Sequence, residues 1–550
     1  MSQAAPMQPA LGELLNGRQK WLVLISLMLC MFVSALDNSI VATATPRILA
    51  DLGGFSLLSW VFTVYMLSST VVVPLVGKLS DMFGRKLFLI GGIAIFMTAS
   101  AACGAAPSMV FLIVARAVQG IGGGMIFACV FATLGDLFAP AERGKYIGFF
   151  TGTFSLAAIT GPTIGGLLTD GIGWRWCFYV NIPVAILAIT FISMNLPMKK
   201  TGGRLANIDF LGAALLGGAT ISLLLALVWA QTEFGWASAE TMGLFVAAVV
   251  LGVAFVFQER RHPEAIFPLV LFRNRVFVQA NILVMFLGAG MFGAIQYLPT
   301  FVQTALGATA TASGLVSTPQ SLGMLTTSIV GGQILARTGR FKYQVIAGAC
   351  IILIASVLLH TLDVGVPTWH IAVFMIVYGL GSGMVMPTMS VITQSAVAHQ
   401  YMGVATAGRQ FFMQIGQVMG TAIFGVILAT SYGSAFADSA GPEAKAVTPP
   451  AVYEQFVDPT LALDKRQFST TRAEVLKLPD GQNILGSLLD AQKEGVATAI
   501  QDIFLLSSAM ALVVVALAVT LPEIPLRRGF GSEPETHPHG AGQAIALETP

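Results

Sequence analysis

The stretch Gly77–Lys86 reads GKLSDMFGRK, and it lies where one long apolar run of the chain ends and the next is about to begin. A second stretch, Gly332–Phe341, reads GQILARTGRF and aligns with the first without gaps, matching two glycines and one arginine. Each stretch follows the second apolar run of a block of six. The sequence therefore predicts two repeated halves with the same internal order of elements.

The composition excludes most other classes of protein. Hydrophobic residues make up 55% of the 550 residues, and only 10% are Asp, Glu, Lys or Arg, against roughly 25% in an ordinary soluble domain. A soluble chain of this kind would expose aggregating apolar patches, and a disordered chain needs the opposite composition. A net charge of +2 without a dense basic stripe argues against a nucleic-acid partner. The chain is expected to be an integral membrane protein in contact with the lipid bilayer.

A membrane-spanning helix needs about 20 mostly apolar residues, and the chain contains fourteen such runs. They are continuously apolar rather than alternating, which indicates helices and not barrel strands. The expected fold is therefore all-α, with two six-helix bundles and two inserted helices. The runs lie at 22–46, 57–77, 87–106, 109–135, 146–169, 177–197, 209–230, 241–258, 276–304, 310–335, 341–362, 368–395, 403–430 and 499–521.

This count divides the chain into five parts. They are an N-terminal tail (1–21), an N-terminal six-helix bundle (22–200), two inserted helices (201–262), a C-terminal six-helix bundle (263–525) and a C-terminal tail (526–550).

The basic residues predict the orientation in the membrane. Twenty of the 29 Lys and Arg residues fall in tails and short loops on one side, and two, Arg47 and Arg175, fall in short loops on the other. This bias predicts that both termini lie in the cytoplasm and that the protein crosses the cell (inner) membrane many times. The five cysteines have no metal-ligand spacing, so no metal site is expected.

Two ionisable residues, Asp37 and Arg116, lie deep within predicted spans, where charges are costly and mark functional sites. Each is a similar number of residues from the outer end of its helix, so both lie about 10–14 Å below the outer surface. We expect them to face one another. Burial favours a neutral carboxyl group and a nearby guanidinium favours the ionised one, so Asp37 is a candidate proton carrier with Arg116 as its partner. A permanent ion pair that only fixes helix packing is the alternative.

Here the sequence resembles a known family. Gly77–Lys86 completes the loop motif G-x-L-x-D-x-x-G-R-K of the major facilitator superfamily, and the other matches resemble its fourteen-helix drug:proton antiporter family. They are Leu36–Val41 with Pro46 in the first helix, Arg116–Gly122 in the fourth, Gly161–Gly166 in the fifth, and Trp174–Phe178 with Asn181–Pro183 at the entry to the sixth. Two departures are Ala42, where the family usually has Asn, and Met413, where an Arg is common and Arg409 sits one turn earlier.

The resemblance implies a major facilitator fold and an antiporter that exports small lipophilic or cationic compounds by alternating access, with protons as the coupling ion and no other cofactor. Multidrug efflux and antibiotic resistance are the expected roles. A single deep carboxylate further predicts neutral or monovalent substrates rather than dications.

The resemblance also implies a cytoplasmic gate and an antiporter hinge. In a gate, charge pairs between the halves form in one state and break in the other. The alternative interpretation of these residues is a basic loop that only sets the topology. Pro in a helix kinks it and glycines permit close helix contact, so close packing alone is the alternative for the hinge. The gate residues are Gly77, Asp81, Gly84, Arg85, Lys86 and Asp136, and the hinge residues are Gly161, Pro162, Gly165 and Gly166.

Polar and aromatic residues within the spans are candidates for the substrate cavity, because aromatic faces and a few amides suit flat lipophilic cations. Anchoring at the membrane interface and hydrogen bonds between helices are the alternatives. The candidates are Tyr65, Gln296, Tyr297, Tyr378, Gln394 and Gln414.

The long loop 431–498 is predicted to lie outside the membrane, with a short amphipathic helix at Ile484–Ile500 lying on the outer surface. It suits either a solvated connector or a docking site for a periplasmic adaptor protein.

Other functions stay open to different degrees. A phosphate-binding loop for ATP is absent from the sequence, and the six histidines form no catalytic pattern, which disfavours an enzyme. An importer, or a proton-coupled transporter of lipid or of a specific metabolite, would have the same fold.

Overall fold

A computed structural model describes residues 14–53, 57–198, 208–308, 316, 318–458, 461 and 465–523, and these residues are largely helical. Most of the predicted tails, and residues 201–207 at the start of the inserted segment, lie outside the described residues. Thirteen of the described helices are long and apolar enough to cross a membrane. The chain is therefore a multi-pass helical membrane protein.

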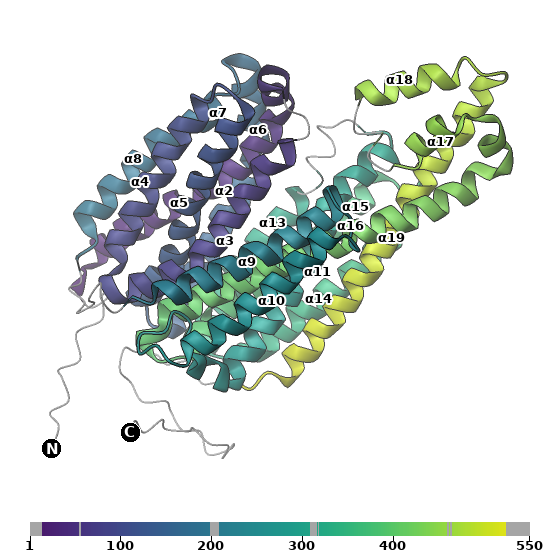
Figure 1. The fold of residues 1–550 in the computed structure, drawn as a ribbon. Coiled ribbons are helices and arrows are strands. Elements are labelled where there is room, and N and C mark those ends of the chain that lie inside the picture. The colour runs from purple at the N-terminus through teal and green to yellow at the C-terminus, as the bar shows by residue number, and fades with distance from the viewer. Residues whose placement is uncertain are drawn as a thin grey trace, which may run out of the picture.

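The N-terminal half has six spans, which form one bundle (Figure 1). Gly84, with a φ of +95°, ends the second span and begins the third, so the two helices are separated by a single residue. The Ser108 hydroxyl caps the fourth span by accepting from the Phe111 N–H. The helices are α2 (Gly17–Leu52), α3 (Leu58–Phe83), α4 (Arg85–Gly104), α5 (Met109–Leu137), α6 (Pro140–Gly171), and α7 (Trp176–Tyr179) with α8 (Asn181–Asn195) as the sixth span.

The two inserted helices, α9 (Phe210–Thr232) and α10 (Ala239–Glu259), pack against each other, and α9 also contacts α3 and α16. The Asp209 side chain caps α9 by accepting from the Gly212 N–H. The rings of Trp60 and Trp229 meet edge to face, with centroids 5.9 Å apart. The inserted pair therefore lies beside the line where the two halves meet.

The C-terminal half repeats the order of spans and ends in two long helices, the first of which is kinked at Gly441. Its elements are η3 (Leu269–Arg273), α11 (Arg275–Thr304), α13 (Thr318–Thr338), α14 (Lys342–His360), α15 (Thr368–Ser395), η4 (His399–Tyr401), α16 (Met402–Val447), α17 (Pro450–Phe456), α18 (Lys465–Val475) and α19 (Gly481–Thr520). Helix α13 is the predicted tenth span, and it is the one that falls outside the thirteen apolar helices. It packs against α6 and α15, so much of its polar surface faces protein rather than lipid.

The segment 431–498 corrects one expectation. The predicted surface helix at Ile484–Ile500 is the first part of α19, which continues into the membrane as one helix of 40 residues. Its apolar residues Leu485 and Leu488 are buried in the same cluster as Tyr432 of α16. The amphipathic face was correctly expected, but it packs on another helix instead of on lipid. Figure 1 shows α17 and α18 at the far end of this pair, beyond the bundle.

The two halves touch at one end of the bundle, which we call the basic end because Arg85 and Arg340 lie there beside Gly84 and Gly339. Gly332 of α13 lies so close to α6 that a Cβ would be 2.2 Å from the Gly144 carbonyl oxygen. Contacts of this kind join α6 to α13 and α3 to α16. They indicate a conformation that is closed at the basic end.

Candidate functional site

Asp37 of α2 and Arg116 of α5 form an ion pair in the middle of the N-terminal half. Neither residue has exposed surface, and the Arg116 Nη1 atom donates to Asp37 Oδ2 at 2.5 Å. Burying such a pair costs desolvation energy, which further hydrogen bonds to its remaining atoms help to offset.

Two amides complete the shell around the carboxylate. Gln119 Nε2 and Asn181 Nδ2 both donate to the other oxygen of Asp37, at 2.8 and 2.9 Å. Gln119 lies one turn after Arg116 on α5, and Asn181 is the first residue of α8. The carboxylate of α2 therefore joins three helices of one half.

The Arg116 guanidinium has a mixed set of partners. Its Nη1 also donates to Gln119 Oε1 at 2.7 Å, and its Nε donates to the Val61 carbonyl at 3.2 Å. The Tyr65 ring lies under the guanidinium, 4.4 Å from centroid to Cζ. Among the described residues, Nη2 has no hydrogen-bond partner. Hydrogen bonds hold the Asp37 carboxylate on both oxygens, while the Nη2 amino group of the cation has no partner among the described residues.

Sequence reasoning placed Gln119 and Asn181 in family motifs but gave them no part in the charge site. The spacing of Gln119, three residues after Arg116, is a usable signal because side chains at i and i+3 share one helix face. Asn181 is 144 residues from Asp37, and no local pattern links them.

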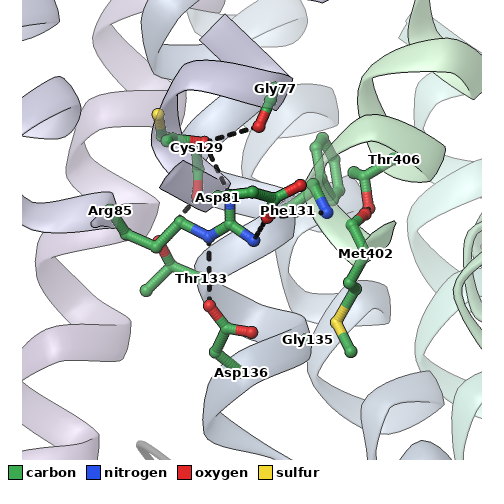
Figure 2. Close-up of polar contacts among 12 residues, drawn as sticks. Gly77, Asp81, Arg85, Cys129, Phe131, Thr133, Gly135, Asp136, Met402 and Thr406 are labelled. Atoms are coloured by element: carbon green, nitrogen blue, oxygen red, sulfur yellow. Dashed lines mark hydrogen bonds and ion pairs between the residues drawn. The ribbon is translucent and has the colours of Figure 1, made fainter. Parts of the chain in front are cut away.

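A second charged cluster lies at the basic end. Arg85, the first residue of α4, donates from Nε to Asp136 at 3.0 Å and from Nη1 to the Ser80 hydroxyl at 2.6 Å, and its Nη2 bonds to Asp81. Figure 2 shows the guanidinium of Arg85 between Asp81 and Asp136. One arginine therefore ties the ends of α3, α4 and α5 together.

Asp81 also reaches across to the other half. Its two carboxylate oxygens accept from the backbone N–H groups of Gly403, at 3.2 Å, and Val404, at 3.0 Å. These are free donors in the first turn of α16, where the helix dipole favours a negative charge. A Cβ at Gly403 would lie 2.4 Å from the Asp81 carboxylate, so a larger residue there would push the carboxylate away from the backbone N–H groups. The motif carboxylate thus holds the halves together at the basic end.

Three other motif residues lie outside this contact or play a different part from the one expected. Gly77 belongs to α3 and not to a loop: a Cβ there would lie 2.5 Å from that of Ala407 on α16, so Gly77 permits close helix packing. Gly84 alone makes the turn. Lys86 donates to the Ser193 carbonyl of α8 at 2.7 Å, which is a bond within the N-terminal half.

The predicted hinge glycines pack α6 against the helix that carries Asp37. A Cβ at Gly161 would lie 2.3 Å from that of Ser39, and one at Gly165 would lie 2.1 Å from the Thr43 hydroxyl oxygen, both on α2. Gly166 has no atom of another helix within 4 Å of such a position. Pro162 lies inside α6, which runs on as a helix to Gly171.

The six cavity candidates do not gather at one place. Tyr65 belongs to the charge site, Gln296 is exposed, and the Tyr297 hydroxyl donates to the Thr421 carbonyl at 2.9 Å within the C-terminal half. Tyr378 is 2% exposed in the hydrophobic core, and Gln414 is partly buried.

Gln394 is the candidate that bridges the halves. It donates from α15 to the Phe131 carbonyl of α5 and to the Thr406 hydroxyl of α16, both at 3.2 Å.

Relatives among known proteins are numerous. Over 429 residues the chain is 39% identical to the Bacillus subtilis protein named "Multidrug transporter protein MdtP", covering 78% of this chain and 79% of that one. It is 35% identical over 405 residues to "Multidrug resistance protein 3" of the same species, covering 74% and 79%. An "Efflux pump FUS6" of Gibberella fujikuroi is 29% identical over 441 residues, covering 77% and 79%.

Solved structures and a family model agree with the fold. The human organic anion transporter MFSD10 superposes with a TM-score of 0.58 at 13% identity, covering 90% of this chain and 99% of that one. The proton:xylose symporter XylE superposes with a TM-score of 0.54 at 14% identity, covering 92% and 97%. The model of the Major Facilitator Superfamily matches residues 27–257 and 207–421. With two six-span halves held together by the Gly77–Lys86 motif, the chain belongs to the major facilitator superfamily.

Proposed function

We propose that this chain is a proton-coupled exporter of small lipophilic compounds, a multidrug efflux antiporter that works by alternating access. Relatives named as multidrug transporters support the substrate class. The excess of Lys and Arg supports a cytoplasmic location for the basic end and for both termini, in the cytoplasmic membrane.

The observation that carries proton coupling is the Asp37 carboxylate, which is fully buried and bonded to donors from α5 and α8. A proton on Asp37 would remove the negative charge that offsets Arg116. The guanidinium would then be left buried and unpaired, which is strongly unfavourable. Protonation therefore has to be accompanied by a rearrangement of α2, α5 and α8, and this links the proton to the conformation of the half.

The contact of Asp81 with α16 supports the alternating part of the proposal. It joins the halves at the basic end in the present conformation. Opening towards the cytoplasm requires this contact to break and the α6–α13 approach at Gly332 to separate. Substrate would enter between the halves from the cytoplasm in that opened state, whereas protons would reach Asp37 from the opposite end in the conformation that is closed at the basic end.

The test compares wild type with Asp37→Asn in inside-out vesicles, with ethidium as a fluorescent lipophilic cation and an imposed pH gradient. The variant is expected to lose at least about tenfold of gradient-driven uptake, as for other essential proton-transfer groups, but to retain exchange of labelled for unlabelled ethidium. Asp51→Asn is the matched control, because Asp51 lies on the same helix but about half of its side chain is exposed. Full gradient dependence in Asp37→Asn would show that the pair is only structural.

A further inference from the structure

Arg409 is the one charged side chain that is buried in the described part of the C-terminal half. It lies on α16 with 3% of its surface exposed. Its Nη2 reaches the Gln410 amide oxygen only at 3.4 Å, and its Nε has no hydrogen-bond partner. No ion pair joins it to a carboxylate of the described residues. Its guanidinium is therefore almost without compensation.

The other buried arginines show how unusual this is. Arg116 has the Asp37 carboxylate, and Arg85 has those of Asp81 and Asp136. Arg143 has no bonded carboxylate, but it donates to the carbonyls that end α5, those of Phe138 and Gly135, at 2.8 and 2.7 Å. Each has strong acceptors built into the fold, whereas Arg409 has none of comparable strength.

Arg409 lies where the halves meet. It is seven residues into α16, which places it about 10 Å along the helix from the first turn that Asp81 contacts. Its Cζ is 5.6 Å from the centroid of the Phe131 ring, which belongs to α5 in the other half. Gln394 lies close to the same place, because its amide nitrogen donates to the Phe131 carbonyl and to the hydroxyl of Thr406, one turn before Arg409. The amide oxygen of Gln394 has no hydrogen-bond partner among the described residues. When the halves separate at the basic end, α5 moves away from α16 and the guanidinium becomes accessible from the cytoplasm.

Burying an unpaired cation is costly. The chemistry that offsets it is an anion, and the planar guanidinium fork suits a carboxylate, which can accept two parallel N–H bonds. A monoanion would also leave this site neutral, as the Asp37–Arg116 pair already is. The Phe131 ring gives the same place an apolar face. These features together fit a lipophilic molecule that carries one carboxylate.

We propose that Arg409 binds the anionic group of a transported compound, so that lipophilic monocarboxylates are among the substrates. This inference deepens the proposed export function and rests on it for transport, but not for binding.

The test measures binding of 1-pyrenebutyrate and of its neutral methyl ester to the purified full-length chain, in nanodiscs of phosphatidylcholine, by pyrene fluorescence. Loss of a charge-assisted hydrogen bond corresponds to about tenfold or more in affinity. Arg409→Met is therefore expected to weaken pyrenebutyrate binding at least about tenfold more than ester binding. Arg409→Lys keeps the charge but lacks the planar guanidinium, so its affinity for pyrenebutyrate is expected to lie between those of wild type and Arg409→Met.

Three controls make the result decisive. Arg340→Gln removes an exposed arginine at the same end and is expected to leave the preference for the anion unchanged. Removing an uncompensated buried cation is expected to leave the melting temperature of Arg409→Met equal or higher, so misfolding does not explain a loss. Displacement of the probe by added phosphatidylglycerol would assign the anion to a lipid headgroup and overturn the substrate assignment.

Equal weakening of the acid and the ester by Arg409→Met would overturn the inference. Absence of gradient-driven transport in the wild type would instead overturn the proposed function, while the charge preference in binding would still be measured by itself.

Discussion

The two halves of the molecule share a backbone plan but treat charge in opposite ways. In the N-terminal half each buried arginine bonds to strong acceptors of the same half; Arg116, for example, forms an ion pair with Asp37. In the C-terminal half Arg409 is buried without a bonded carboxylate among the described residues. The repeat preserves Gly84 and its counterpart Gly339, both with positive φ, because the helix break needs them.

The comparison separates what the fold requires from what transport requires. Positions that shape the backbone are the same in the two motif stretches, while Asp81 corresponds to Ala336 in the second one. A charged residue that is present in only one half is not needed to build a half. We therefore interpret the charges as parts of the cycle: coupling in the N-terminal half, contact between the halves at Asp81, and substrate binding in the C-terminal half.

The largest expected difference is between removing the buried arginine of the N-terminal half and removing that of the C-terminal half. Arg116→Met leaves the Asp37 carboxylate buried without a counter-charge, which costs about 3–5 kcal/mol of folding free energy. Thermal unfolding of the purified protein is expected to show a large loss that the second change Asp37→Asn mostly restores. Arg409→Met is the matched substitution in the other half and is expected to cause no loss. If both single variants lowered the melting temperature equally, the contrast between the halves would be wrong.

A smaller effect is expected at the contact between the halves. Asp81→Asn removes the negative charge at the first turn of α16, an interaction of about 1–2 kcal/mol. The population open at the basic end is expected to rise close to tenfold. The distance between spin labels at Lys145 of α6 and Arg337 of α13 measures this, in a background without native cysteines.

Lys86→Gln is the control for that experiment, because its ammonium group bonds within the N-terminal half. A shift of the same size in Lys86→Gln would mean that general surface charge, and not the Asp81 bond to α16, holds the basic end closed.

The smallest effect is expected at the opposite end of the N-terminal half. The pKa of Asp51 is lowered, first by the hydrogen bond from the Trp174 indole and then by that from Arg175. A lowered pKa means that the ionised group stabilises the fold above the ordinary value of 3.8 and that this contribution is lost as the pH falls through the lowered value. Asp51→Asn is therefore expected to reduce the melting temperature slightly at pH 7 and not at all near pH 2. A difference that grew on acidification would contradict this assignment.

The sequence was sufficient for the membrane-spanning segments and for their order, because long apolar runs have few alternatives in a bilayer. It did not predict α17, α18 or the full length of α19. It did place Asp37 and Arg116 at one depth, which follows from helix rise alone. Their amide partners were less accessible. Asn181 begins a different helix, and only the packing of α2 on α8 brings it to the carboxylate.

Contacts to the backbone were beyond sequence reasoning for a physical reason. Asp81 binds N–H groups at the start of α16, and backbone donors have no signature in the sequence. Polar residues within spans were equally ambiguous, since Tyr378 lies in the core and Gln394 lies between the halves. The apolar face of Ile484–Ile500 was predictable from the sequence. An apolar face does not show, however, whether it packs against lipid or against another helix such as α16.

The joined helices α16 and α19 have a mechanical consequence. Forty residues of α19 span about 60 Å, roughly twice the hydrocarbon thickness of a bilayer. The projecting part of α19 is a direct continuation of its membrane span. Beside it, the Tyr432 hydroxyl of α16 donates to the Phe456 carbonyl of α17 at 2.6 Å and so ties α17 to α16. If the C-terminal half tilts during transport as proposed, helices α17 and α18 would move through a larger arc than the bundle, and a force applied to them would act on the tilt of the whole half.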